Sequence, residues 1–168
     1  MAEEVYAMKK TVWLLAYIGS IVLANICTTR FGLVPIGFGL MVTAGTFAAG
    51  FALIARDAVQ VSSGKIVVLL AIVSGAAISA ITSNPAIALA SGIAFLVSEL
   101  IDFAVFTPLK GKSLARAVVI SSIVSAPVDT VLFLYLAGFG VTWQAVLGQF
   151  IVKTALALIA AIIINAKR

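Results

Sequence analysis

The sequence predicts an all-α integral membrane protein, a bundle of six transmembrane helices with both termini in the cytoplasm. Hydrophobic residues make up 63% of its 168 residues and charged residues only 10%, whereas an ordinary soluble domain has roughly 45–50% and about 25%. The mean hydropathy is +1.24. The apolar residues form long continuous blocks rather than short alternating segments, a pattern typical of spanning helices. A water-soluble fold is therefore excluded.

Six apolar blocks predict the spans, since a helix needs about 20 apolar residues to cross a bilayer. In chain order, the expected spans are residues 11–28, 39–56, 65–81, 85–106, 113–136 and 142–165. Turn-forming residues separate them, at Gly32, Pro35 and Gly37, then around residues 62–64 and 83–85, then at Pro108 and Gly111, and finally at Gly138 and Gly140. The blocks leave no length for a soluble domain, so residues 1–168 are expected to form a single transmembrane domain.

Lysine and arginine residues gather at alternate ends of the spans. On one side of the expected membrane lie Lys9 and Lys10, Arg56 and Lys65, Lys110, Lys112 and Arg116, and the terminal Lys167 and Arg168, and on the other only Arg30. Because positively charged loops stay in the cytoplasm, this asymmetry predicts a multi-pass protein of the cytoplasmic (inner) membrane with both termini inside. The topology explains the net charge of +5, so nucleic acid is not expected as a partner.

The residue types that most enzymes and metal sites need are scarce in this sequence. Histidine is absent and Cys27 is the one cysteine, so neither a cysteine and histidine metal site nor an intrachain disulfide is expected. No Gly-rich phosphate loop and no nucleophile with a recognisable base occurs. Carboxylates alone would suit an intramembrane aspartyl protease, but the motifs of such proteases are missing. We therefore expect no enzymatic activity and no cofactor.

Ionisable residues within the expected spans are the strongest functional signal. Glu99 and Asp102 lie three residues apart in the fourth block, and Gln149 and Lys153 lie four apart in the sixth, so each pair shares one helical face. Asp129 lies inside the fifth block. A charge at the centre of a spanning helix costs about 2.5–3.5 kcal/mol on insertion scales. These side chains are therefore expected to face the interior of the bundle.

Two interpretations of these charges remain open. In the first, they are interhelical ion pairs and hydrogen bonds that fix the bundle, with Lys153 opposite one carboxylate. In the second, which we favour, they line a polar internal site, because a buried ion pair is often no more stabilising than apolar residues. A carboxylate accepts two parallel hydrogen bonds, as from an amidine, a guanidine-like edge or a purine. Aromatic residues that could stack on such a ligand are Phe95, Phe103, Phe106, Trp13 and Trp143.

Four stretches of the chain carry a resemblance to a known family. They are Leu23-Ala24-Asn25-Ile26, then Ala44-Gly45-Thr46 leading to Ala55-Arg56-Asp57-Ala58-Val59-Gln60, then Ser98-Glu99-Leu100-Ile101-Asp102, and Pro127-Val128-Asp129-Thr130. The most specific feature is the Ser-Glu-Leu-any-Asp segment followed by a mid-helix Asp in the next span. In these stretches the sequence resembles the vitamin uptake transporter family, the queuosine precursor transporters.

The resemblance implies a six-helix carrier that imports a 7-deazaguanine, the 7-cyano or 7-aminomethyl precursor of queuosine and archaeosine. By position in the matching stretches and polar faces, the implied substrate contacts are Asn25, Asp57, Glu99, Asp102, Asp129, Gln149 and Lys153. The implied partners are this purine-like small molecule and the lipid bilayer. No obligatory ATPase partner is implied, and the oligomeric state stays open.

Three other functions fit the sequence less well. A substrate-binding subunit of an energy-coupling-factor vitamin importer has a similar size and helix count, but it would need partner ATPases. A structural membrane scaffold would use the interior charges for stability alone. An ion channel is disfavoured because the acidic residues lie on several helices without a sign of a symmetric pore.

Overall fold

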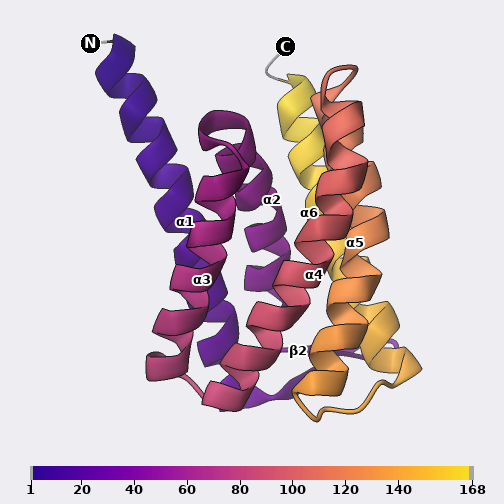
Figure 1. Ribbon diagram of the computed structural model, residues 1–168. Helices are drawn as coiled ribbons and strands as arrows, with labels where there is room; N and C mark the ends of the chain where they lie inside the picture. Colours follow the sequence, from indigo (N-terminus) through magenta and orange to yellow (C-terminus); the bar gives the residue numbers. More distant parts are fainter. Residues whose placement is uncertain (1, 167–168) are drawn as a thin grey trace.

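The computed structural model describes residues 2–166 as a helical bundle closed at one end by a β-hairpin (Figure 1). In chain order its elements are α1 (Ala2–Phe31), β1 (Leu33–Gly37), β2 (Leu40–Thr43), α2 (Thr46–Ser63), α3 (Lys65–Thr82), α4 (Pro85–Lys110), α5 (Leu114–Leu136) and α6 (Trp143–Ala166). The basic residues Lys167 and Arg168, which support the predicted orientation, lie outside the described residues, as does the side chain of Lys9. All six predicted helices are present within the described range.

Five of the six helices in residues 2–166 are long and apolar enough to cross a membrane. They are α1 from Lys10 onward, α3, α4, α5 and α6. The sixth helix, α2, falls short because its 18 residues include Arg56, Asp57 and Gln60. The protein is thus an all-α, multi-pass membrane protein, and α2 carries a buried ion pair and a buried amide inside the bundle.

Capping residues explain why two helices begin where the sequence predicts. Asn84 accepts hydrogen bonds from the backbone N–H groups of Ala86 (2.8 Å) and Ile87 (3.4 Å), and Pro85 occupies the first helical position of α4. Ser113 caps α5 by accepting a hydrogen bond of 3.4 Å from the N–H of Arg116. Helices α3, α5 and α6 end or begin within one residue of the predicted spans.

The second predicted span, residues 39–56, is wrong in its position. Its first residues form strand β2, and α2 runs later, over Thr46–Ser63. The turn of the hairpin is built from Gly37, Phe38 and Gly39, whose φ angles of 96°, 53° and 72° are all positive and favour glycine. As a result Arg56 lies in the interior of α2 and not at its end. Two other helices are longer than predicted, since α1 extends in both directions and α4 continues through Pro108 to Lys110.

The β-hairpin lies at the end of the bundle opposite the two termini (Figure 1). Its strands pair antiparallel, with Leu33 opposite Thr43 and Val34 opposite Val42, and an irregularity follows Pro35. A Cβ atom added at Gly148 of α6 would overlap the carbonyl oxygen of Met41, so this glycine allows β2 to lie directly on α6. Pairing within the hairpin satisfies backbone groups where the chain has no helix.

Small residues allow the helices to approach one another closely. A Cβ atom at Gly45 would overlap the carbonyl oxygen of Ala24 in α1, and one at Gly75 of α3 would lie 3.1 Å from Ile21 Cδ1. Close packing over small residues is the usual way in which helices associate in lipid. The buried apolar cluster that joins α1 to α4 includes Tyr17, Ile21, Leu53, Ile72 and Phe95.

Candidate functional site

All seven site residues predicted from the sequence are buried inside the bundle. None of them is more than 5% exposed. They form two groups. Asn25, Asp129, Gln149 and Lys153 line one pocket, and Asp57, Glu99 and Asp102 surround Arg56.

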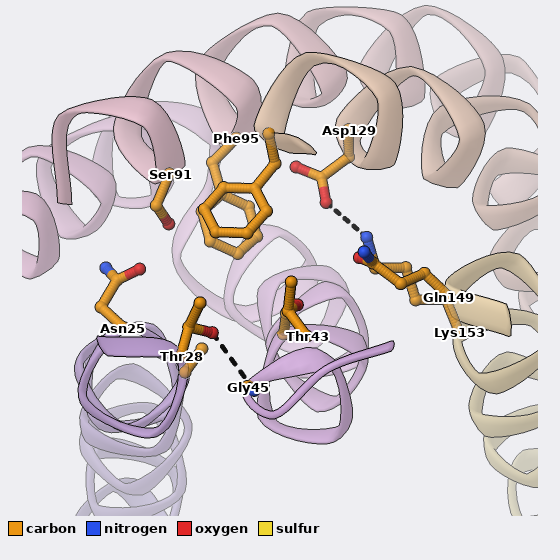
Figure 2. A pocket seen from close by; sticks show the side chains of 12 residues that line it. Asn25, Thr28, Thr43, Gly45, Ser91, Phe95, Asp129, Gln149 and Lys153 are labelled. Carbon is orange, nitrogen blue, oxygen red and sulfur yellow. Dashed lines mark hydrogen bonds and ion pairs between the residues drawn. The ribbon is translucent and has the colours of Figure 1, made fainter. Parts of the chain in front are cut away.

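The first group lines a pocket in the half of the bundle next to the hairpin, which we call the hairpin-side pocket (Figure 2). Its volume is about 20 Å³, about the space of one water molecule, so a larger ligand enters only when the lining side chains move apart. Its lining residues are Ala24, Asn25, Thr28, Thr43, Gly45, Ala49, Ser91, Phe95, Asp129, Phe133, Gln149 and Lys153.

An ion pair forms one wall of the hairpin-side pocket. Lys153 Nζ lies 2.6 Å from Asp129 Oδ2 and donates a second hydrogen bond of 2.9 Å to Thr130 Oγ1. Ser98 Oγ donates to the other carboxylate oxygen of Asp129 at 3.5 Å. The predicted pairing of Lys153 with a carboxylate is therefore confirmed. An ionised carboxylate offers about four lone-pair sites, so Asp129 can still accept hydrogen bonds from a ligand.

Two amide groups in the pocket have no partner. Asn25 Nδ2 and Gln149 Nε2 make no hydrogen bond within residues 2–166, although the residues are only 2% and 1% exposed. In Figure 2 the Asn25 amide faces the cavity and Gln149 lies beside Lys153, with the Phe95 ring between the two sides. A buried donor without a partner costs roughly 1–3 kcal/mol. The arrangement is therefore typical of a site that receives hydrogen-bond acceptors from a ligand.

The second group is organised by one fully buried arginine. Arg56 is 0% exposed, and its Nε lies 2.8 Å from Glu99 Oε1. Its Nη1 lies 2.9 Å from Asp57 Oδ1 and donates a hydrogen bond of 3.0 Å to Gln60 Oε1. Its Nη2 pairs with Asp102 Oδ2. We call Arg56 with these four partners the Arg56 cluster.

The Arg56 cluster changes the interpretation of one basic residue and three acidic ones. The sequence placed Arg56 at a cytoplasmic loop, which is wrong, because the later start of α2 moves it into the bundle. Asp57, Glu99 and Asp102 bind this arginine and do not line the hairpin-side pocket. One signal pointed to Arg56, namely that the acidic residues inside the expected spans outnumber Lys153 and require another cation.

Helices α4 and α5 connect the two groups of polar residues. Ser125 Oγ of α5 donates to Asp102 Oδ1 of the Arg56 cluster at 3.2 Å. Ser98 of α4 bonds to Asp129 in the hairpin-side pocket. Neither contact could be predicted from the sequence. Residue spacing along one helix does not reveal which helices face each other.

The aromatic residues proposed as stacking surfaces lie in different parts of the structure. Phe95 lines the hairpin-side pocket. Phe106 lies over the guanidinium of Arg56, with 5.9 Å from the Arg56 Cζ to the ring centroid. Trp13 and Trp143 are 37% and 65% exposed. The expectation that these two tryptophans stack on an internal ligand is therefore wrong, since they lie on the outer surface, where tryptophan anchors helices in the membrane interface.

The interior of the bundle holds more acidic than basic groups. Within the described residues, the buried carboxyl groups are those of Asp57, Glu99, Asp102 and Asp129, and the buried cations are Arg56 and Lys153. Four carboxylates against two cations leave two surplus negative charges if all are ionised. Uncompensated charge is costly inside a membrane protein. Such an interior is suited to a ligand that presents hydrogen-bond donors or a positive charge.

Comparison with known families assigns the chain to a family. The family model described as "Putative vitamin uptake transporter" matches residues 11–166, a range that includes every residue lining the hairpin-side pocket. No curated protein and no solved structure gives a significant match. Because the profile covers nearly the whole chain, the resemblance seen in the sequence is confirmed, and the chain belongs to the vitamin uptake transporter family of membrane transporters for small molecules.

Proposed function

We propose that this chain imports a 7-deazaguanine, the 7-cyano or 7-aminomethyl precursor of queuosine and archaeosine, across the cytoplasmic membrane. It does so as a carrier that needs no ATPase partner, and the hairpin-side pocket binds the substrate. Membership of the vitamin uptake transporter family supports the transport of a small molecule. The identity of the substrate rests on the chemistry of the pocket together with the resemblance in the four sequence stretches.

The observation that carries the proposal is a carboxylate next to two unpartnered amide donors. The guanine-like edge of a 7-deazaguanine presents N1–H and an exocyclic amine as donors and a ring carbonyl as an acceptor. Asp129 accepts from the donor pair, while Asn25 Nδ2 and Gln149 Nε2 are free to donate to the carbonyl and ring nitrogen. Phe95 offers its ring to the flat base, since aromatic rings stack favourably. Asp129 and the two amides thus each have a complementary group on the ligand.

The orientation assigns a direction to the pathway. If the basic loops face the cytoplasm, the hairpin end of the bundle faces the outside, because it lies opposite the termini (Figure 1). The hairpin-side pocket then receives substrate from the outside. Asp57, Glu99 and Asp102 lie deeper, around Arg56, and we place them on the route by which the substrate continues inward.

A feeding experiment tests this function. Cells that cannot make or import the precursor are given the chain and supplied with 7-aminomethyl- or 7-cyano-7-deazaguanine, and queuosine is measured in their tRNA. The chain is expected to restore queuosine. The proposal fails if no queuosine appears although the chain is present in the membrane.

A pair of variants on α6 connects the feeding result to the pocket. Gln149→Leu removes an unpartnered donor that lines the pocket. Gln144→Leu makes the same change one and a half turns earlier, at a half-buried residue outside the pocket. Because one hydrogen bond is worth about 0.5–1.5 kcal/mol, Gln149→Leu is expected to reduce uptake at limiting precursor by about two- to tenfold. Equal uptake by the two variants, at equal amounts in the membrane, would remove the pocket from the proposal.

A further inference from the structure

A second cavity lies in the half of the bundle that holds the termini, and we call it the termini-side cavity. It has a volume of about 220 Å³ and lies between α2, α3 and α4. Its lining residues are Gln60, Lys65, Val68, Leu69, Glu99, Leu100 and Phe103. It is therefore the larger of these two cavities.

The Arg56 cluster separates the two cavities. Along α2, Ala49 lines the hairpin-side pocket, Arg56 follows, and Gln60 lines the termini-side cavity. At 1.5 Å per residue, Ala49 and Gln60 are about 16 Å apart along the helix. Along α4 the order is the same, with Phe95 in the first pocket and Phe103 in the second cavity. The two cavities thus occupy successive depths of one bundle.

The termini-side cavity has a mostly apolar wall with a few polar groups of the kinds found in the hairpin-side pocket. Glu99 supplies a carboxylate, Gln60 a primary amide and Phe103 an aromatic ring. Gln60 is 6% exposed, and its Nε2 has no hydrogen-bond partner within residues 2–166. A carboxylate, an unpartnered amide donor and a phenylalanine are also the groups that the first pocket offers to a flat ring with donors and an acceptor.

We infer that the termini-side cavity is a second binding station for the same substrate, reached after the hairpin-side pocket and emptied toward the cytoplasm. This inference rests on the proposed function. Its distinctive feature is that Glu99 and Gln60 belong to both the cavity and the Arg56 cluster. A substrate that takes a hydrogen bond from Gln60 Nε2 and donates to Glu99 binds two side chains whose other atoms hold Arg56. Occupation of the second station is therefore coupled to the partition between the cavities.

The edge of the cavity carries an exposed cation. Lys65 begins α3 and is exposed, and its Nζ lies 3.9 Å from the centroid of the Phe103 ring. A cation over an aromatic face is attracted by about 0.5–1 kcal/mol at an exposed site, which is weak enough for a ligand to displace. Displacement of Lys65 frees that face of Phe103 for the substrate ring.

Thiol accessibility tests the second station. Cys27→Ser removes the one native thiol, and Val68→Cys then places a thiol in the wall of the cavity at a residue that is 3% exposed. Ile72→Cys, one turn later on α3, is equally buried but lines neither cavity, so it is the matched control. A charged, water-soluble methanethiosulfonate is added to inside-out membrane vesicles. We expect the thiol at position 68 to react several times faster than that at position 72, and Leu69→Cys serves as a second reporter in the cavity wall.

Protection by substrate completes the test. With 7-aminomethyl-7-deazaguanine at ten times its half-saturating concentration, only about a tenth of the sites stay empty, so the reaction at position 68 is expected to slow by up to about tenfold. Adding Gln60→Glu keeps an acceptor for Arg56 but removes the Nε2 donor, and it is expected to weaken the protection. Gln144→Glu, outside both cavities, is expected to leave the protection unchanged.

The outcomes separate the second station from the proposed function. If the parent chain supports uptake but position 68 reacts no faster than position 72, or is not protected by the precursor, the second station is overturned. Reaction only with membrane-permeant reagents also overturns it, because the cavity is then filled by lipid. If the parent supports no uptake in the feeding experiment, the proposed function has failed, whatever the thiols do.

Discussion

Arg56 is the residue on which the interior polarity depends. It is fully buried, pairs with three carboxylates, and donates to Gln60. A planar guanidinium presents five N–H donors in a fixed fork, whereas the ammonium of a lysine is a compact charge with three. Removing one partner of a buried ion pair usually costs more than the pair contributes, because the remaining charges are left uncompensated.

Replacement of Arg56 tests this role. Arg56→Met leaves three carboxylates buried without a cation and is expected to lower the free energy of unfolding by about 3–5 kcal/mol. Arg56→Lys is expected to lie between this variant and the parent. The measurement is the melting temperature of the purified protein in detergent. Arg30→Met, at an exposed arginine, is the control and should melt like the parent. A parent-like melting temperature of Arg56→Met would contradict the role of this cluster.

The pair Lys153 and Asp129 distinguishes a transporter from a scaffold. Lys153→Met or Asp129→Asn alone breaks the 2.6 Å ion pair and is expected to destabilise the protein, whereas the double variant regains most of that stability because no charge is left unpaired. Uptake is expected to stay low in the double variant, since Asp129 also receives the donors of the substrate. Recovery of both stability and uptake would show that the pair is only structural.

The sequence predicted the site at the level of single helices. Glu99 with Asp102, and Gln149 with Lys153, share helical faces, because spacing along one helix decides this. Which cation meets which carboxylate depends on the order and rotation of different helices, and no spacing within a helix reveals it. Arg56 was misplaced for a further reason. The predicted span ended at residue 56, so Arg56 was assigned to a cytoplasmic loop. Because α2 in fact runs over Thr46–Ser63, this arginine lies inside the helix.

At the level of elements, the exit of the β-hairpin is the tightest contact near the pocket. Gly45 follows β2, and its N–H donates a hydrogen bond of 3.2 Å to Thr28 Oγ1 of α1. A Cβ atom at position 45 would lie 2.6 Å from this Oγ1 and would overlap the Ala24 carbonyl oxygen. Gly45 also lines the hairpin-side pocket, so a shift of the hairpin here changes the shape of the site.

Gly45→Ala tests this contact. Overpacking at a closely packed position costs typically about 1–3 kcal/mol, so the variant is expected to melt earlier and to take up less precursor. Gly19→Ala is the matched control, because a Cβ atom at Gly19 of α1 meets nothing within 4 Å and alanine favours a helix. If the two variants had the same melting temperature and uptake, Gly45 would not hold the hairpin against α1.

The hairpin is also the element that the sequence analysis missed. Leu33-Val34-Pro35 and Leu40-Met41-Val42 flank a Gly-Phe-Gly turn, a pattern that fits two short strands. Short apolar segments are ambiguous between helix and strand. Among long apolar helical blocks, residues 39–43 were therefore assigned to the start of a span. The fourth and fifth blocks had the capping residues Asn84 and Ser113 at their starts, and there the predicted starts agree with the structure to within one residue.

The orientation of the whole molecule gives a direct labelling prediction. Phe38 lies fully exposed at the tip of the hairpin, and Lys112 is exposed in the turn between α4 and α5 at the opposite end. In a Cys27→Ser background, a membrane-impermeant maleimide added to intact cells is expected to label Phe38→Cys but not Lys112→Cys, since basic loops face the cytoplasm. The reverse labelling pattern would invert the proposed direction of entry.

Across the whole molecule, polar groups extend from one cavity to the other through a bundle that is otherwise apolar. The Arg56 cluster and the Lys153 pair account for every buried charge in the described residues and leave a surplus of two carboxylates. A scaffold has no need of this surplus or of the unpartnered amides of Asn25, Gln60 and Gln149. A carrier for a donor-rich ring uses both.

Transport by the purified chain is the most direct test of this account. The protein is reconstituted alone into liposomes, and uptake of radiolabelled 7-aminomethyl-7-deazaguanine is measured with empty liposomes and the Gln149→Leu variant alongside. We predict saturable uptake by the chain alone, inhibited by unlabelled precursor and reduced in the variant. No uptake above empty liposomes, or uptake that appears only when partner ATPase subunits and ATP are added, would contradict a stand-alone carrier for this substrate.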